Sequence, residues 1–129
     1  MEKRKENGRE IWVGQNRLYL GDDNILYVTI VGERDEKTVT EISEAYSKFR
    51  NMIEGTIDVL INLNKAGKPT SGARKIEREM TEHEKTGKVA FFGLHPVAKI
   101  LASFLMGTTR KKDTRFFMTE EKALAWLKE

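Results

Sequence analysis

The chain has 129 residues, the length of one domain of ordinary size and enough to bury a single hydrophobic core. Hydrophobic residues make up 39% of it and charged residues 33%, a balance typical of a globular protein and unlike that of a disordered chain. The formal net charge of +3 is small and dispersed, so composition alone does not argue for a nucleic-acid partner, and none is expected. Cysteine is absent, which excludes disulfides, thiolate catalysis and zinc–thiolate sites.

Neither a membrane span nor a secretion signal is expected. No apolar run reaches the roughly 18 residues that a transmembrane helix needs. The charged segment 1–10 lacks the apolar centre of a signal peptide. The sequence therefore predicts a cytoplasmic protein without a transmembrane segment.

The N-terminal part predicts three strands. Residues 1–10 are polar and are expected to be a loosely ordered lead-in. Short strands are predicted over 11–13 and 17–20, separated by turn-forming residues. The nearly continuous apolar and β-branched run 25–31 predicts a central strand buried on both faces.

A change of period marks the first helix. Over 35–53 apolar residues recur every three or four positions, which predicts an amphipathic helix covering one face of a sheet. Thr38 and Glu41 have the spacing of a capping box. A buried strand is predicted over 58–63, and a polar loop containing glycine and proline over 64–69.

Three helices and two strands are expected in the rest of the chain. A second helix is predicted from about 71 to 85, and its glutamates alternate with basic residues as on a solvated face. These glutamates are Glu77, Glu79, Glu82 and Glu84. A strand over 89–93 precedes a third helix that begins near Pro96, a residue suited to the first helical position. A strand over 115–118 precedes a last helix capped by Thr119.

Strands that alternate with helices after an initial hairpin predict an α/β fold. Right-handed crossovers make the later strands parallel. We expect one domain, residues 1–129, with a mixed and mostly parallel sheet of about five strands and about four helices packed on it.

The segment 64–74 is the strongest candidate for a site, because ligands and partners usually meet an open α/β sheet at the carboxyl ends of its strands. Its amide, basic and glycine residues suit contact with a partner or an anion. They are Asn64, Lys65, Gly67, Lys68, Gly72 and Arg74. The glycine spacing matches no nucleotide-binding fingerprint, so a plain turn is the alternative.

Thr70 and Ser71 stand where the second helix begins. A hydroxyl at this position caps the first helical turn. The alternative is that one of them accepts a phosphate, whose charge would gain from the helix dipole and from the basic residues nearby.

We expect no catalytic residues, no metal site and no cofactor. The two histidines, His83 and His95, lie in different elements, and His95 directly precedes Pro96 as a residue at the start of a helix would. No acid, base or nucleophile set accompanies the basic segment, which disfavours an enzyme acting on anionic metabolites.

The third predicted helix is apolar almost all round, so it needs cover on more than one side. The N-terminal segment, a second subunit or an apolar ligand held between helix and sheet would each supply that cover. The residues expected on this dimer or ligand face are Ile100, Leu101, Phe104 and Leu105.

Four segments carry a resemblance to a known family over roughly residues 10–129. They are Gly67 to Ser71, Gly93 to Val97, Arg115 to Phe117 and Glu120 to Leu127. Through them the chain resembles the SpoIIAA-like branch of the STAS superfamily, which includes bacterial anti-sigma factor antagonists and shares a fold with CRAL-TRIO lipid-binding proteins.

The resemblance implies a bacterial, non-enzymatic regulatory module that binds a protein partner. In phosphorylated antagonists the acceptor lies just before a Ser-Gly pair, which puts Thr70 at that position here, although Pro69 replaces the family's aspartate. The alternative is a carrier or sensor of a small apolar ligand or lipid, held in a CRAL-TRIO-like pocket under the third helix. A homodimer is a further expectation.

Overall fold

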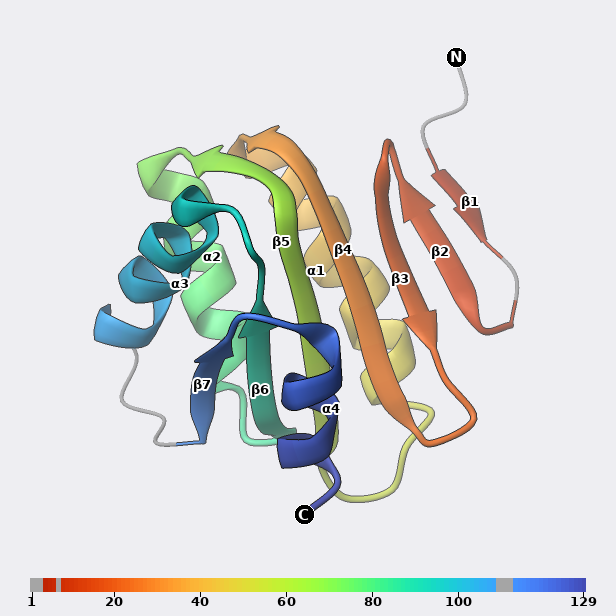
Figure 1. Ribbon diagram of the computed structural model, residues 1–129. Coiled ribbons are helices and arrows are strands. Elements are labelled where there is room, and N and C mark those ends of the chain that lie inside the picture. The colour runs from red at the N-terminus through yellow and green to blue at the C-terminus, as the bar shows by residue number, and fades with distance from the viewer. Residues whose placement is uncertain (1–3, 7, 109–112) are drawn as a thin grey trace.

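The computed structural model describes residues 4–6, 8–108 and 113–129, with side chains described over 8–103 and 113–129. It contains one sheet of seven strands and four helices (Figure 1). The strands are β1 (Arg4–Glu6), β2 (Glu10–Val13), β3 (Asn16–Leu20), β4 (Ile25–Arg34), β5 (Ile57–Pro69), β6 (Thr86–Phe92) and β7 (Thr114–Phe117). The helices are α1 (Glu36–Arg50), α2 (Ser71–Glu82), α3 (Pro96–Thr108) and α4 (Glu120–Leu127).

The strands lie side by side in sequence order, β1-β2-β3-β4-β5-β6-β7. Pairing is antiparallel from β1 to β4 and parallel from β4 to β7. The predicted α/β class and mixed sheet are confirmed. The sheet has seven strands rather than about five, and half of its pairings are parallel rather than most. A strand as short as β1 leaves no periodic signal in a polar segment.

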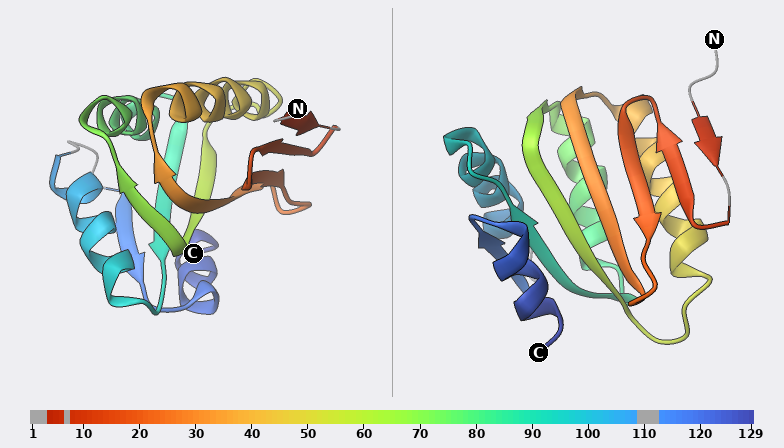
Figure 2. Two further views of the ribbon diagram at one scale, coloured as in Figure 1. Left: turned by 90° about the horizontal axis from the view of Figure 1, so that it is seen from above. Right: turned by 45° about the vertical axis from the view of Figure 1, so that its right-hand side comes forward.

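Helices cover the two faces of the sheet unequally (Figure 2). Helices α1, α2 and α3 pack on one face, as right-handed crossovers between neighbouring parallel strands require. The large core there includes Leu18, Phe49, Phe91 and Leu101. Helix α4 lies on the other face, where Trp126 belongs to a smaller core.

The prediction of a loop over 64–69 is wrong, because these residues continue β5 alongside β4. Lys65 is paired with Val31 and Pro69 with Arg34, with shifts of register between. A Cβ on Gly67 would lie 2.9 Å from the backbone nitrogen of Glu33, so glycine permits this close approach. The long β4–β5 ribbon curls over the upper edge of the sheet in Figure 1.

Two local predictions are corrected. Helix α1 is capped by Asp35, whose carboxylate accepts the Thr38 N–H at 2.9 Å, and not by a Thr38–Glu41 box. Strand β4 is not buried on both faces, because Tyr27 and Thr29 are half-buried. Helix α4, at eight residues, covers β5–β7 and leaves that side of β3 and β4 open.

Candidate interaction site

Residues 64–74 form the end of β5 and the first turn of α2, and are called the contact segment below. Thr70 links the two elements: its N–H donates to Arg34 O at 2.9 Å, and its hydroxyl accepts the Ala73 N–H at 3.1 Å. Thr70 is therefore the N-cap of α2. Ser71, the next residue, is exposed and is the first residue of the helix.

The side chains expected to meet a partner reach solvent. Those that are exposed are Asn64, Lys65, Lys68, Thr70, Ser71 and Arg74. The two glycines make room for neighbouring groups instead: Gly67 for the Glu33 backbone, and Gly72 for the Glu36 side chain, whose Oε1 would lie 1.8 Å from an added Cβ. The Glu36 side chain at the amino end of α1 therefore lies against the first turn of α2. No φ value among the contact segment's residues is positive, so the segment is not a glycine-rich anion nest.

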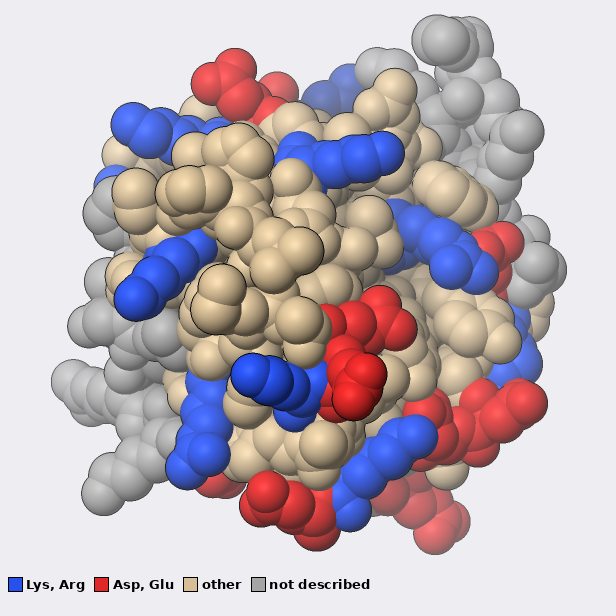
Figure 3. Space-filling model, in the orientation of Figure 1, with Lys and Arg blue, Asp and Glu red and all other residues tan. Residues whose placement is uncertain are grey.

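An apolar surface adjoins the contact segment. The Asn64 carboxamide oxygen accepts the Leu94 N–H at 2.8 Å, which holds the end of β5 against the turn before α3. Four exposed side chains form what we call the apolar patch: Leu94 (66% exposed), Val97 (38%), Ile100 (54%) and Met118 (59%). Figure 3 shows uncharged surface over the start of α3, with Lys and Arg side chains around it.

Of the residues predicted on the dimer or ligand face of the third helix, one is buried and one is exposed. Leu101 is 3% exposed and packs in the large core with Ala98 and Ala102, so it is unavailable to a second subunit. Ile100 points to solvent. The side chains of Phe104 and Leu105 lie outside the described residues.

Beneath the contact segment lies a charged pair that sequence reasoning missed. Glu77 was expected on a solvated face, but it is 9% exposed, and Arg34 is 3% exposed. Arg34 Nε donates to Glu77 Oε2 at 2.5 Å and Nη2 to Oε1 at 3.3 Å. Arg34 Nη1 also donates to the Gly67 carbonyl at 3.1 Å. The pair thus ties β4, the contact segment and α2 together. No local pattern in the sequence signals it, because the two residues lie 43 positions apart.

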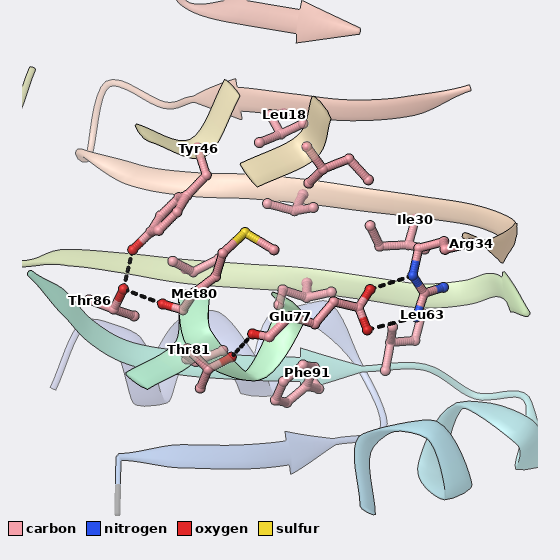
Figure 4. A pocket seen from close by; sticks show the side chains of 15 residues that line it. Leu18, Ile30, Arg34, Tyr46, Leu63, Glu77, Met80, Thr81, Thr86 and Phe91 are labelled. Atoms are coloured by element: carbon pink, nitrogen blue, oxygen red, sulfur yellow. Dashed lines mark hydrogen bonds and ion pairs between the residues drawn. The ribbon is translucent and has the colours of Figure 1, made fainter. Parts of the chain in front are cut away.

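The Arg34–Glu77 pair lies at one end of a cavity of about 80 Å³ between the sheet and helices α1 and α2 (Figure 4). At the other end Tyr46 hydrogen-bonds Thr86, whose hydroxyl donates to Met80 O at 2.8 Å. Burial raises the pKa of the Tyr46 phenol, so the group is neutral. The walls between are mostly apolar. Among the α3 residues whose side chains are described, 96–103, none lines this cavity.

The remaining candidates for chemistry have structural roles. His95 Nδ1 accepts the Val97 N–H at 3.2 Å at the start of α3, and His83 Nδ1 accepts the Lys85 N–H after α2. Within residues 8–103 and 113–129, no group of three His, Cys, Asp or Glu residues could hold a metal ion. Across the same described parts, no helix is long and apolar enough to cross a membrane.

Several solved structures are similar to this fold, and two of them are described here. One is an uncharacterized protein from the DUF3478 family with a SpoIIAA-like fold from Shewanella loihica PV-4, with a TM-score of 0.67 and 16% identity over 87% of this chain and 91% of that one. The other is the anti-sigma factor antagonist SpoIIAA in its unphosphorylated form, with a TM-score of 0.60 and 16% identity over 88% of this chain and 97% of that one. The protein therefore has the SpoIIAA-like α/β fold that its sequence predicts.

Sequence comparison identifies the family to which the chain belongs. The model of a family described as "Domain of unknown function (DUF7793)" matches residues 19–129, so the chain belongs to that family. No curated protein matches the chain.

Proposed function

We propose that this protein is a non-enzymatic regulatory module of the bacterial cytoplasm that acts by binding another protein through the contact segment and the adjoining apolar patch. The observation that carries the proposal is the hydrogen bond from Leu94 to Asn64. It joins exposed basic and hydroxyl groups to four exposed apolar side chains at the edge of the sheet where partners usually bind.

The composition of this surface suits protein recognition. It combines exposed apolar side chains with exposed basic side chains of the contact segment, such as Lys65 and Lys68, and protein interfaces likewise combine a hydrophobic core with a polar rim. The SpoIIAA-like fold is that of an anti-sigma factor antagonist, which supports a regulatory role for the same architecture here.

A photo-crosslinking residue tests the proposal. It replaces Lys68 in one variant and Glu54, an exposed residue in the turn before β5, in a control. Crosslinked proteins are identified after irradiation of the source cells. We expect one or a few proteins to be captured from position 68 and not from 54.

The captured partner is then purified and its affinity measured by calorimetry. We expect Leu94→Asp and Lys68→Glu each to weaken binding at least fivefold, and Glu54→Lys to change it less than twofold. Equal capture from both positions, or equal affinity of all the variants, would contradict the proposal.

Regulation of this surface by phosphate at Thr70 or Ser71 is part of the proposal. Both side chains are exposed, and Lys68 and Lys75 are near in sequence at the same helix start, where the dipole favours an anion. The carboxylates of Asp35 and Glu36 at the amino end of α1 would repel a phosphate at this position. Peptide mapping of protein purified from its own cells tests the idea: a phosphate on either residue supports it, and full recovery of the unmodified peptide contradicts it.

The cavity favours a second candidate function, a carrier or sensor of a small apolar ligand. A cavity of about 80 Å³ with mostly apolar walls exceeds the roughly 15 Å³ that one water needs. Native mass spectrometry of protein from its own cells would show an adduct, lost in an Ile61→Phe variant that fills the space. An unadducted wild-type protein that also fails to take up added fatty acid would exclude this function.

A further inference from the structure

The open side of the sheet carries two rows of side chains fixed by strand register. Tyr19, Tyr27 and Leu60 are neighbours across β3, β4 and β5. In the next row Arg17 is followed by Thr29, Asn62 and Phe92. Side chains in one row point to the same face because successive residues of a strand alternate. Helix α4 covers the rows from β5 onward and leaves the β3–β4 part accessible.

These rows and the start of α4 form a groove of about 250 Å³. We call it the sheet groove, and the lining residues that matter here are Arg17, Tyr19, Tyr27, Thr29, Asn62 and Glu120. Its volume lies below the roughly 300–1,000 Å³ of sites for drug-sized ligands and suits one or two amino-acid side chains. The sheet groove lies outside the contact segment, so an inference about it does not depend on the proposed function.

One wall of the sheet groove is a preformed stack. The Arg17 guanidinium lies 4.8 Å from the centroid of the Tyr19 ring and 6.0 Å from that of Trp12. Its Nε is ion-paired with Glu10, and this hydrogen bond lowers the pKa of the Glu10 carboxyl. Arginine, tyrosine and tryptophan are the residues that most often dominate binding energy at protein interfaces. Their side chains already contact one another here, so less conformational entropy is lost when a ligand binds.

The opposite wall carries an uncompensated negative charge. Glu120 lines the groove at the first residue of α4 and is exposed. Among the described residues no cation lies within ion-pairing distance of it. Nearby charges are already matched: Arg17 pairs with Glu10, and Asp23 contacts Lys128 at 3.5 Å. Figure 3 shows acidic side chains over the start of α4 and around the β3–β4 turn.

Polar groups on the floor can hold an extended backbone. The Tyr27 hydroxyl donates to Asp23 at 2.7 Å and is thereby fixed. Asn62 uses its oxygen to accept the Asn64 N–H at 2.9 Å, which leaves the amide NH₂ of Asn62 to donate to a ligand. The Thr29 hydroxyl lies beside it in the same row. A carbonyl group is the natural acceptor for both.

We infer that the sheet groove binds an extended peptide segment of a partner protein, with a lysine or arginine side chain set against Glu120 and the tyrosine wall. The cation complements the unpaired carboxylate, and the peptide carbonyls meet Asn62 and Thr29. The size of the groove limits recognition to a short segment, so affinity should be modest.

Selection from random 12-residue peptides displayed on phage, with the full chain immobilised, tests this inference. We expect the selected peptides to share a lysine or arginine at one position. Synthetic copies are then titrated into wild type, Glu120→Lys, Tyr19→Ala and a matched control, Glu121→Lys. Glu121 is also exposed in the first turn of α4 but does not line the groove.

We expect Glu120→Lys to weaken peptide binding at least tenfold, Tyr19→Ala at least threefold and Glu121→Lys less than twofold. Circular dichroism checks each fold, and Glu120→Gln replaces Glu120→Lys if α4 is lost. Selected peptides without a shared basic residue, equal binding by the two charge reversals, or no selected peptide at all would overturn the inference.

Discussion

The Thr70 hydroxyl satisfies a backbone N–H at the start of α2. Thr70→Ala should therefore lower the free energy of unfolding by about 1 kcal/mol. Thr70→Asp keeps an acceptor and adds a charge that the helix dipole favours, so its stability should stay near that of wild type. Ser71→Ala is the control and should change stability by less than about 0.5 kcal/mol. Urea unfolding measures all three, and an unchanged Thr70→Ala would show that the cap is not formed.

Asp35 makes the stability of α1 depend on pH. The Thr38 N–H holds the pKa of the Asp35 carboxyl below its ordinary value of 3.8. The charged cap should stabilise the fold fully above about pH 5. This stabilisation should be lost as the pH falls from the ordinary pKa of 3.8 toward the lower pKa of Asp35 in the folded protein. Asp35→Asn still caps the helix but does not titrate. Thermal unfolding between pH 7 and pH 2.5 should show wild type losing more stability than Asp35→Asn.

Elements are joined by the buried Arg34–Glu77 pair, which links β4 to α2. Removing one partner leaves a buried charge, so Arg34→Met or Glu77→Leu alone should cost about 3–5 kcal/mol. The double variant should cost much less than the sum, because no charge is left uncompensated. Denaturant unfolding of the four proteins gives the coupling free energy, and additive losses would refute the pairing.

The two glycines of the contact segment differ in what an added Cβ would meet: backbone at Gly67 and a side chain at Gly72. Gly67→Ala would place a methyl group 2.9 Å from the Glu33 backbone nitrogen, so β4 and β5 must move apart. Overpacking of this kind costs about 1–3 kcal/mol. At Gly72 the nearest atoms belong to the flexible Glu36 side chain, which can turn away, so Gly72→Ala should stay within about 1 kcal/mol of wild type. Equal losses in urea unfolding would contradict the close β4–β5 approach.

Helix faces were predicted less well than helix positions. The N-cap Thr119 is confirmed by its bond from the Lys122 N–H at 3.3 Å, and the spans of all four helices are recovered within a few residues. Caps and periods are local signals carried by neighbouring residues. The burial of Glu77 was missed because it depends on Arg34, 43 positions away in sequence, which no local pattern reports.

For the molecule as a whole, two substitutions in α3 test whether the protein self-associates through this helix. Leu101→Glu should prevent folding, because its side chain belongs to the core. Ile100→Glu should leave the fold intact and, if a second copy covers the apolar patch, convert a dimer to a monomer in analytical ultracentrifugation. A folded Leu101→Glu protein would contradict the core assignment, and an Ile100→Glu protein of unchanged mass would exclude a dimer through this face.

The sequence by itself determined the α/β class and the order of every element after β1, and it predicts residues 64–74 as the candidate site. These follow from hydrophobic period, from capping residues and from the rule that partners meet the carboxyl ends of parallel strands. Only the tertiary structure showed that 64–69 continue β5, that Arg34 and Glu77 meet in the interior and that the sheet groove stays open beside α4. Each of these depends on which segments pack together, and packing between distant residues is not encoded in any single stretch of the chain.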